Sequence, residues 1–199
     1  ADLVRRTLSV TLRNSPILPR DIAIQLAQDV EAVAIPVLQD SPVFTDEDLI
    51  ELVLSLTASK QAAIANRDGL SVTLTEVISE HGAVEAVRAL SANEGAEYTD
   101  RAFEHSIRRF GSDEGVQKGL ISREYIPTHI AEKMVSLVSG QLFDLLVNRH
   151  ELPAQLAIDL ASGARERATI DLVEQAGRTH DLPRFVSQLH LNGRLTHSL

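Results

Sequence analysis

The segment LPRDIAIQLA, residues 18–27, decides the fold, because its pattern returns as IPTHIAEKMV at 126–135 and as LPAQLAIDLA at 152–161. In each segment an apolar residue is followed by proline, and further apolar residues stand three, four, seven and eight positions after that proline. This spacing places the apolar side chains on one stripe of an amphipathic helix. Each segment therefore predicts a helix that starts at its proline.

Seven such starts, each an apolar residue followed by Pro, Ser or Thr, occur at a regular spacing. They are Leu18-Pro19, Phe44-Thr45, Leu70-Ser71, Tyr98-Thr99, Ile126-Pro127, Leu152-Pro153 and Leu182-Pro183. Successive starts are 26, 26, 28, 28, 26 and 30 residues apart, a period typical of repeat proteins. Pro is tolerated in the first turn of a helix, and Ser or Thr can cap it. The second, third and fourth units fit the stripe less well, and in the second and fourth Asp48 and Ser106 stand at apolar positions.

A second helical stretch follows the first in five of these units. The stretches are Glu31–Leu38, Ser59–Asn66, Ala83–Ala92, Glu114–Ile121 and Gln141–Asn148. Turn-forming side chains precede the next start, at Asn14, Asp40, Asn66, Asn93 and Asn148. Helices of about ten residues are marginal alone and persist by packing on their neighbours. The sequence therefore predicts an all-α protein of short, stacked helix pairs.

We expect one repeat domain over residues 1–199, and we expect the chain to be a fragment of a longer protein. It opens at Ala1, residues 3–12 look like the second helix of a unit, and the unit that starts at Pro183 stops early. The pattern is blurred at two places. Residues 132–150 have little more than Gly140 as a break, and Ala154–Ala176 can be one helix or two.

Composition limits the classes of partner and of chemistry. The net charge of −9 disfavours nucleic acid and anionic membranes, because both need clustered Lys and Arg. No apolar run approaches the roughly 18 residues of a membrane span. The chain has no Cys, which excludes disulfides and thiolate metal sites and favours a reducing, cytoplasmic location.

No catalytic, cofactor-binding or metal-ligating residue is predicted. The ten glycines form no phosphate-binding loop, the serines form no nucleophile elbow, and the seven histidines lack the helical zinc-protease spacing. The His-acid pairs at 150–151 and 180–181 precede equivalent starts and are interpreted as turn residues. The acidic run at 46–48 suits the positive end of a helix dipole.

Five residues are candidate contacts to a protein partner: Tyr98, Arg108, Arg109, Phe110 and Tyr125. Tyr and Arg are frequent in interface hot spots. Structural interpretations compete with this one, because Tyr98 can pack on the first turn of its helix as a staple and the two arginines suit a helix C-terminus. A sharper alternative for the arginines is an anion or phosphoprotein contact.

Several segments carry a family resemblance. They are Leu18-Pro19 with Ala23, Leu26, Ala27 and Asp29; Ser41–Leu49; Ala62–Ala65 leading to Leu70-Ser71; Ala89-Leu90 with Asn93 and Ala96; and Leu152-Pro153 with Ala164–Ala168. They resemble an uncharacterised bacterial family of HEAT-like proteins, best represented in alphaproteobacteria. The resemblance spans residues 14 to 170, and Ser41–Leu49, with the form S-P-V-x-x-D-x-D-L, is its most specific part.

This resemblance implies a right-handed α-α superhelix, a HEAT-like solenoid of short helix pairs with a 26–30 residue period, in the bacterial cytoplasm. It implies no activity, no cofactor and no functional residue. The leading hypothesis is a non-catalytic protein–protein interaction scaffold or regulatory module that binds neither nucleic acid nor membrane. Its partner and its oligomeric state are left open. The alternative is a HEAT-like enzyme acting on a nucleic-acid base or a chromophore, which the charge of −9 and the lack of Trp and Cys disfavour.

Overall fold

The computed structural model describes residues 2–138 and 140–150, which belong to the first of two compact units, Ala1–His150. Within these residues the chain forms eleven α-helices and no strand, which confirms the all-α prediction. The question of one or two helices over Ala154–Ala176, and the starts at Pro153 and Pro183, lie outside the described residues.

The helices follow one another as pairs. The first helices of the pairs are α2 (Arg20–Gln28), α4 (Asp46–Ser55), α6 (Val72–His81), α8 (Asp100–Phe110) and α10 (Thr128–Val135). The second helices are α3 (Glu31–Asp40), α5 (Ala58–Ala65), α7 (Val84–Ala92), α9 (Glu114–Ile121) and α11 (Gly140–Arg149). One helix, α1 (Asp2–Leu12), precedes the first pair. The prediction of two helices per unit is confirmed in all five units.

Each of the five starts that lie within the described residues is the N-cap residue of its helix. The hydroxyls of Thr45, Ser71 and Thr99 each accept a hydrogen bond from a backbone N–H three residues later, as N-caps do. Pro19 and Pro127 occupy the same N-cap position without a side-chain bond. Each helix start is therefore determined locally, by residues of the first turn of that helix.

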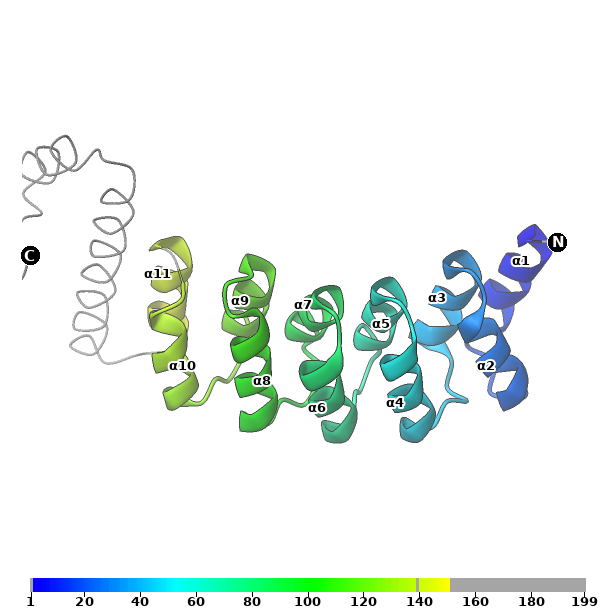
Figure 1. The fold of residues 1–199 in the computed structure, drawn as a ribbon, viewed down its shortest axis with the longest axis horizontal. Helices are drawn as coiled ribbons and strands as arrows, with labels where there is room; N and C mark the ends of the chain where they lie inside the picture. Colours follow the sequence, from blue (N-terminus) through cyan, green and yellow to red (C-terminus); the bar gives the residue numbers. More distant parts are fainter. Residues whose placement is uncertain (1, 139, 151–199) are drawn as a thin grey trace, which may run out of the picture. The chain divides into compact units, whose positions relative to one another are not determined.

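Each pair packs on the next pair along the chain (Figure 1). The second helices contact one another in the order α1, α3, α5, α7, α9 and α11, and the first helices do so from α4 to α10. The main packing contacts join helices of one pair or of neighbouring pairs. The helix α1 packs on α3 as a second helix would, which is the role that the sequence predicts for residues 3–12.

The predicted apolar stripes face the interior. Buried positions include Ala23, Leu26 and Ala27 in α2, Leu49, Leu52 and Val53 in α4, and Ile130, Ala131, Met134 and Val135 in α10. Three stripe positions, Ile22, Val77 and Ile107, are half-buried. The stripes form the apolar core between the two rows of helices. Their burial stabilises the fold because it removes apolar surface from water.

Asp48 and Ser106, the polar residues at apolar positions of the second and fourth units, are both buried. Asp48 is 5% exposed, and its Oδ2 lies 2.7 Å from Arg20 Nε and 3.0 Å from the backbone N of Thr45. The bond from Arg20 lowers the pKa of Asp48. The Ser106 hydroxyl lies 3.5 Å from the hydroxyl of Tyr98. Hydrogen-bond partners thus make polar groups acceptable at core positions.

The helices α7 and α9 approach each other at Gly119. A Cβ atom added to this glycine would lie 2.7 Å from the Cβ of Ser91 and 2.9 Å from its carbonyl carbon. Real Cβ atoms do not come this close to backbone, so only glycine fits between the two helices without a shift.

Candidate functional site

The turns that lead from one helix pair to the next form a row, which we call the turn edge. It consists of residues 13–18, 41–45, 66–71, 93–99 and 122–127. Here each second helix ends and the next first helix begins. Carbonyl groups at the end of a helix have no intrahelical partner, so this edge needs hydrogen-bond donors.

Two arginines supply such donors from the following turn. Arg67 donates from Nη1 to the carbonyl of Leu38 at 2.6 Å and from Nη2 to that of Ser41 at 2.7 Å. Arg123 donates to the carbonyls of Asn93, at 2.9 Å, and Ala96. Burial lowers the pKa of both guanidinium groups. Both arginines are therefore committed to the backbone of the preceding unit.

Between Arg67 and Arg123 along the turn edge, an asparagine also donates hydrogen bonds to carbonyls of the preceding unit. Asn93 donates from Nδ2 to the carbonyls of Ala65 and Arg67 at 2.8 and 2.7 Å, and its Oδ1 accepts from the N–H of Gly95 at 2.9 Å. Further along, a ring nitrogen of His150 lies 2.9 Å from the carbonyl oxygen of Ile121. This contact supports the interpretation of His150 as a turn residue.

At the other side of the helix pairs, where the first helices end, side-chain donors also bind backbone carbonyls. Lys60 and Gln61 donate to the last carbonyls of α2 and α4, with the Nε2 of Gln61 at 2.6 Å from the carbonyl of Val53. Gln117 bonds the carbonyls of Gly111 and Leu137 at 2.7 and 3.1 Å. These buried polar side chains are structural, because each one satisfies carbonyl groups that would otherwise be buried without a partner.

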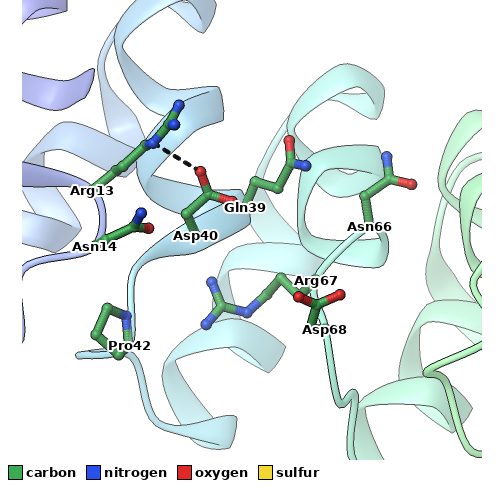
Figure 2. A pocket seen from close by; sticks show the side chains of 8 residues that line it. All are labelled: Arg13, Asn14, Gln39, Asp40, Pro42, Asn66, Arg67 and Asp68. Carbon is green, nitrogen blue, oxygen red and sulfur yellow. Dashed lines mark ion pairs between the residues drawn. The ribbon is translucent and has the colours of Figure 1, made fainter. Parts of the chain in front are cut away.

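A polar pocket opens on the turn edge where three units meet. Its volume is about 500 Å³, and it is lined by Arg13, Asn14, Gln39, Asp40, Pro42, Asn66, Arg67 and Asp68. Figure 2 shows these side chains, which come from the ends of α1, α3 and α5 and from the turns that follow. We call it the amide pocket, after Asn14, Gln39 and Asn66.

The charged groups of the amide pocket are balanced. Arg13 Nε lies 3.1 Å from Asp40 Oδ2, and Arg67 is bound to carbonyls. The lining holds two arginines and two aspartates. In contrast, the side-chain amides of Asn14, Gln39 and Asn66 make no hydrogen bond to any other described residue. The pocket therefore offers unused amide donors and acceptors and the carboxylate of Asp68, while both of its arginines are already bound.

A second pocket lies on the same edge two units further on. It has a volume of about 470 Å³, and its lining comes from residues 94–98, Phe103 and residues 123–125. Three glutamates, Glu94, Glu97 and Glu124, face one arginine there. That arginine, Arg123, is already bound to backbone carbonyls, so the charged groups that remain are the three glutamates. We therefore call this site the carboxylate pocket.

Two of the predicted contact residues line the carboxylate pocket. Tyr98 lies with its ring 4.4 Å below the guanidinium of Arg123, and its hydroxyl is 3.3 Å from the hydroxyl of Ser91. Burial raises the pKa of Tyr98. Tyr125, in contrast, is 73% exposed. Tyr98 thus has a structural role as well as a place in the pocket, whereas Tyr125 is free to meet a partner.

The other three predicted contacts lie elsewhere, at the end of α8 away from the turn edge. Arg109 donates to the carbonyls of Ser79 and Gly82 at 2.9 and 2.8 Å, and its guanidinium lies 4.6 Å from the ring of Phe110. Burial lowers its pKa. Arg108 is exposed. The structure therefore separates the five candidates into two groups at opposite helix ends.

Clustered metal ligands are absent, and buried carboxylates are few, in the described part of the chain. Residues 2–138 and 140–150 contain no group of three His, Cys, Asp or Glu side chains that could hold a metal ion. Asp48 is the buried carboxylate of this part, and it is held by Arg20 and by the backbone of Thr45. Among the same residues, no helix has the length and apolar character needed to cross a bilayer.

Within the described residues, these features define an all-helical protein of successive helix pairs with polar pockets along one row of turns. The chain belongs to the bacterial family DUF2336, described as an uncharacterised protein conserved in bacteria, whose sequence profile matches residues 33–199. This confirms the predicted membership of an uncharacterised bacterial family. Neither the curated proteins nor the solved structures give a match to the chain.

Proposed function

We propose that this protein is a non-catalytic interaction module of the bacterial cytoplasm that binds a protein partner along its turn edge. In this proposal the helix pairs continue as a right-handed, HEAT-like superhelix. The observation that carries the proposal is the amide pocket, which is lined by the unused amides of Asn14, Gln39 and Asn66 from three successive units (Figure 2).

The kind of group that this pocket accepts follows from its lining. A side-chain amide both donates and accepts hydrogen bonds, as a peptide group does. The arginines of the pocket are already committed, so it has no free cation with which to hold phosphate. These properties favour a polypeptide over a nucleic acid, since nucleic-acid binding needs Lys and Arg that can neutralise phosphates.

The acidic balance of the rest of the chain agrees with this choice. The net charge is −9, and the carboxylate pocket adds three glutamates to the same edge. A surface of this charge repels nucleic acid and leaves proteins as the natural class of partner. The enzyme alternative has no comparable support among the described residues, because their buried acid, Asp48, is used in a helix cap.

Photo-crosslinking in cell extract tests the proposal. A photoreactive amino acid replaces Gln39 in the amide pocket or Gln25, an equally polar and exposed residue of α2 outside it. We expect the Gln39 probe, in an extract of the bacterium that encodes the protein, to crosslink a discrete protein that the Gln25 probe does not. Equal labelling from both positions, or crosslinks only to nucleic acid, would contradict the proposal.

A further inference from the structure

We propose that the occupant of the amide pocket is an extended peptide segment, bound through its main chain by Asn14, Gln39 and Asn66. This inference rests on the proposed function and narrows it, because a protein partner can bind as a folded surface, as a helix or as an extended strand. The arrangement of the three amides selects among these forms.

The spacing of the amides fits an extended chain. They stand at the ends of α1, α3 and α5, which are consecutive neighbours in the row of second helices. Packed helices are about 8–10 Å apart, and an extended chain advances by about 3.3 Å per residue. One step along the row therefore corresponds to about three residues. The span from Asn14 to Asn66, two steps, corresponds to about six residues.

The chemistry of the amides also fits a peptide main chain. An extended segment leaves its N–H and C=O groups unpaired, and each must find a partner when water is displaced. An α-helix satisfies these groups internally and has no use for three amides in a row. Because the two arginines and two aspartates balance, the pocket does not require a charged side chain in the segment.

The sequence of the turn edge indicates which units can bind a peptide main chain through an amide. Asn14 and Asn66 both stand five residues before a helix start, at Pro19 and Ser71. In the unit between them this position is Asp40, which is paired with Arg13, and the amide is supplied by the preceding residue, Gln39. Glu94 occupies the same position before Thr99. An ionised carboxylate accepts hydrogen bonds but cannot donate one to a peptide carbonyl. The main-chain contacts should therefore be confined to the amide pocket, which makes Glu94 an internal control.

The first test uses the whole chain and a library of random twelve-residue peptides. Peptides enriched on the wild-type protein are measured again with the variant N14L/N66L, in which leucine keeps the approximate size of asparagine at two exposed positions. We expect the variant to lose at least tenfold in affinity, while E94Q stays within about twofold. Circular dichroism confirms that both variants fold.

The second test addresses the main chain directly. Methylation of alternate peptide nitrogens in an enriched peptide should also reduce the affinity at least tenfold, because it removes backbone donors and keeps the side chains. In ¹⁵N spectra, the side-chain amide signals of Asn14, Gln39 and Asn66 should shift when the unmodified peptide binds.

Several results would overturn the inference: equal affinity for wild type and N14L/N66L, no effect of methylation, or a peptide that binds as a helix. A discrete protein crosslinked at Gln39, together with a failure to select any peptide, would refute the extended segment and leave the proposed function standing. If neither a crosslink nor a peptide appears, both proposals fall.

Discussion

Gly119 provides the sharpest test of how neighbouring units pack. In the variant G119A, the new methyl group would lie 2.7 Å from the Cβ of Ser91 and 3.0 Å from the backbone N of Ala92. Carbon atoms normally pack at about 3.5–4.0 Å, so α7 and α9 would have to move apart by roughly 1 Å. Overpacking of this kind costs about 1–3 kcal/mol.

The same helix contains a matched control. Gly115 is exposed, and a Cβ atom there would meet the side chain of Arg88 at 3.1 Å and the carboxylate of Asp113 at 3.2 Å, but no neighbouring backbone. The variant G115A therefore gains the better helix propensity of Ala, up to about 1 kcal/mol, without the overpacking. Because both variants change Gly to Ala within α9, and only the methyl group at 119 meets the backbone of α7, the difference between them isolates that backbone contact at Ser91 and Ala92.

Urea unfolding followed by circular dichroism measures this difference. We expect G119A to be less stable than G115A by about 1–3 kcal/mol, with unchanged m-values. If G119A were as stable as G115A, the backbones of α7 and α9 would not be in contact at Gly119, and the packing described for these units would be wrong.

Three further predictions use the same measurement. Arg67→Met should destabilise the chain by about 1–3 kcal/mol, because it removes the donors for two carbonyls at the end of α3. Leu26→Asp should cost more than about 3 kcal/mol, because it removes a buried leucine and buries a charge. In Asp113→Asn the helix cap is kept and the ion pair with Arg88 is lost. The bond from Arg88 lowers the pKa of Asp113 to about 2 from its ordinary 3.8, so the wild type should be more stable than the variant at neutral pH. This advantage should disappear as the pH falls from about 4 to 2.

Each of these predictions has a clear contrary result. A stability of Arg67→Met equal to that of the wild type would show that the carbonyls find other partners. A small loss in Leu26→Asp would place that side chain outside the core. A constant gap between wild type and Asp113→Asn from pH 7 to pH 2 would show that the ionised carboxylate does not contribute.

The helix pairs could be predicted from the sequence because their signals are local. Thr45, Ser71 and Thr99 cap helices through bonds to residues three positions away, and the apolar stripe has the period of one helix. The second helices follow from the same period. In each case the deciding interactions lie within about ten residues, which a periodic pattern records directly.

The polar contacts between units could not be predicted in the same way. Arg67 and Arg123 look like ordinary turn residues, and their carbonyl partners lie 26 to 32 residues earlier. Their shared position was a usable signal, since each stands four residues before a helix start, at Ser71 and Pro127. The period thus marks equivalent residues, but only the packed structure shows what they bind.

The candidate site shows the same limit. The sequence marked Asn14 and Asn66 as turn residues, and their convergence with Gln39 depends on the stacking of three units. Conversely, side-chain chemistry makes Tyr98 and Arg109 candidate partner contacts, and the structure shows that both also bind groups of the chain itself. A side chain suited to an interface is equally suited to internal hydrogen bonds.

The most direct measurement of the central claim, that helix pairs stack only on their neighbours, is a set of spin-label distances along the turn edge. The chain has no Cys, so a cysteine placed at Asn14 and a second one at Asn66, Glu94 or Glu124 can be labelled specifically. These pairs span two, three and four units. If helix pairs stack only on their neighbours, the distance rises at each step by about 8–10 Å. A distance from Asn14 to Glu124 no longer than that from Asn14 to Asn66 would contradict this claim.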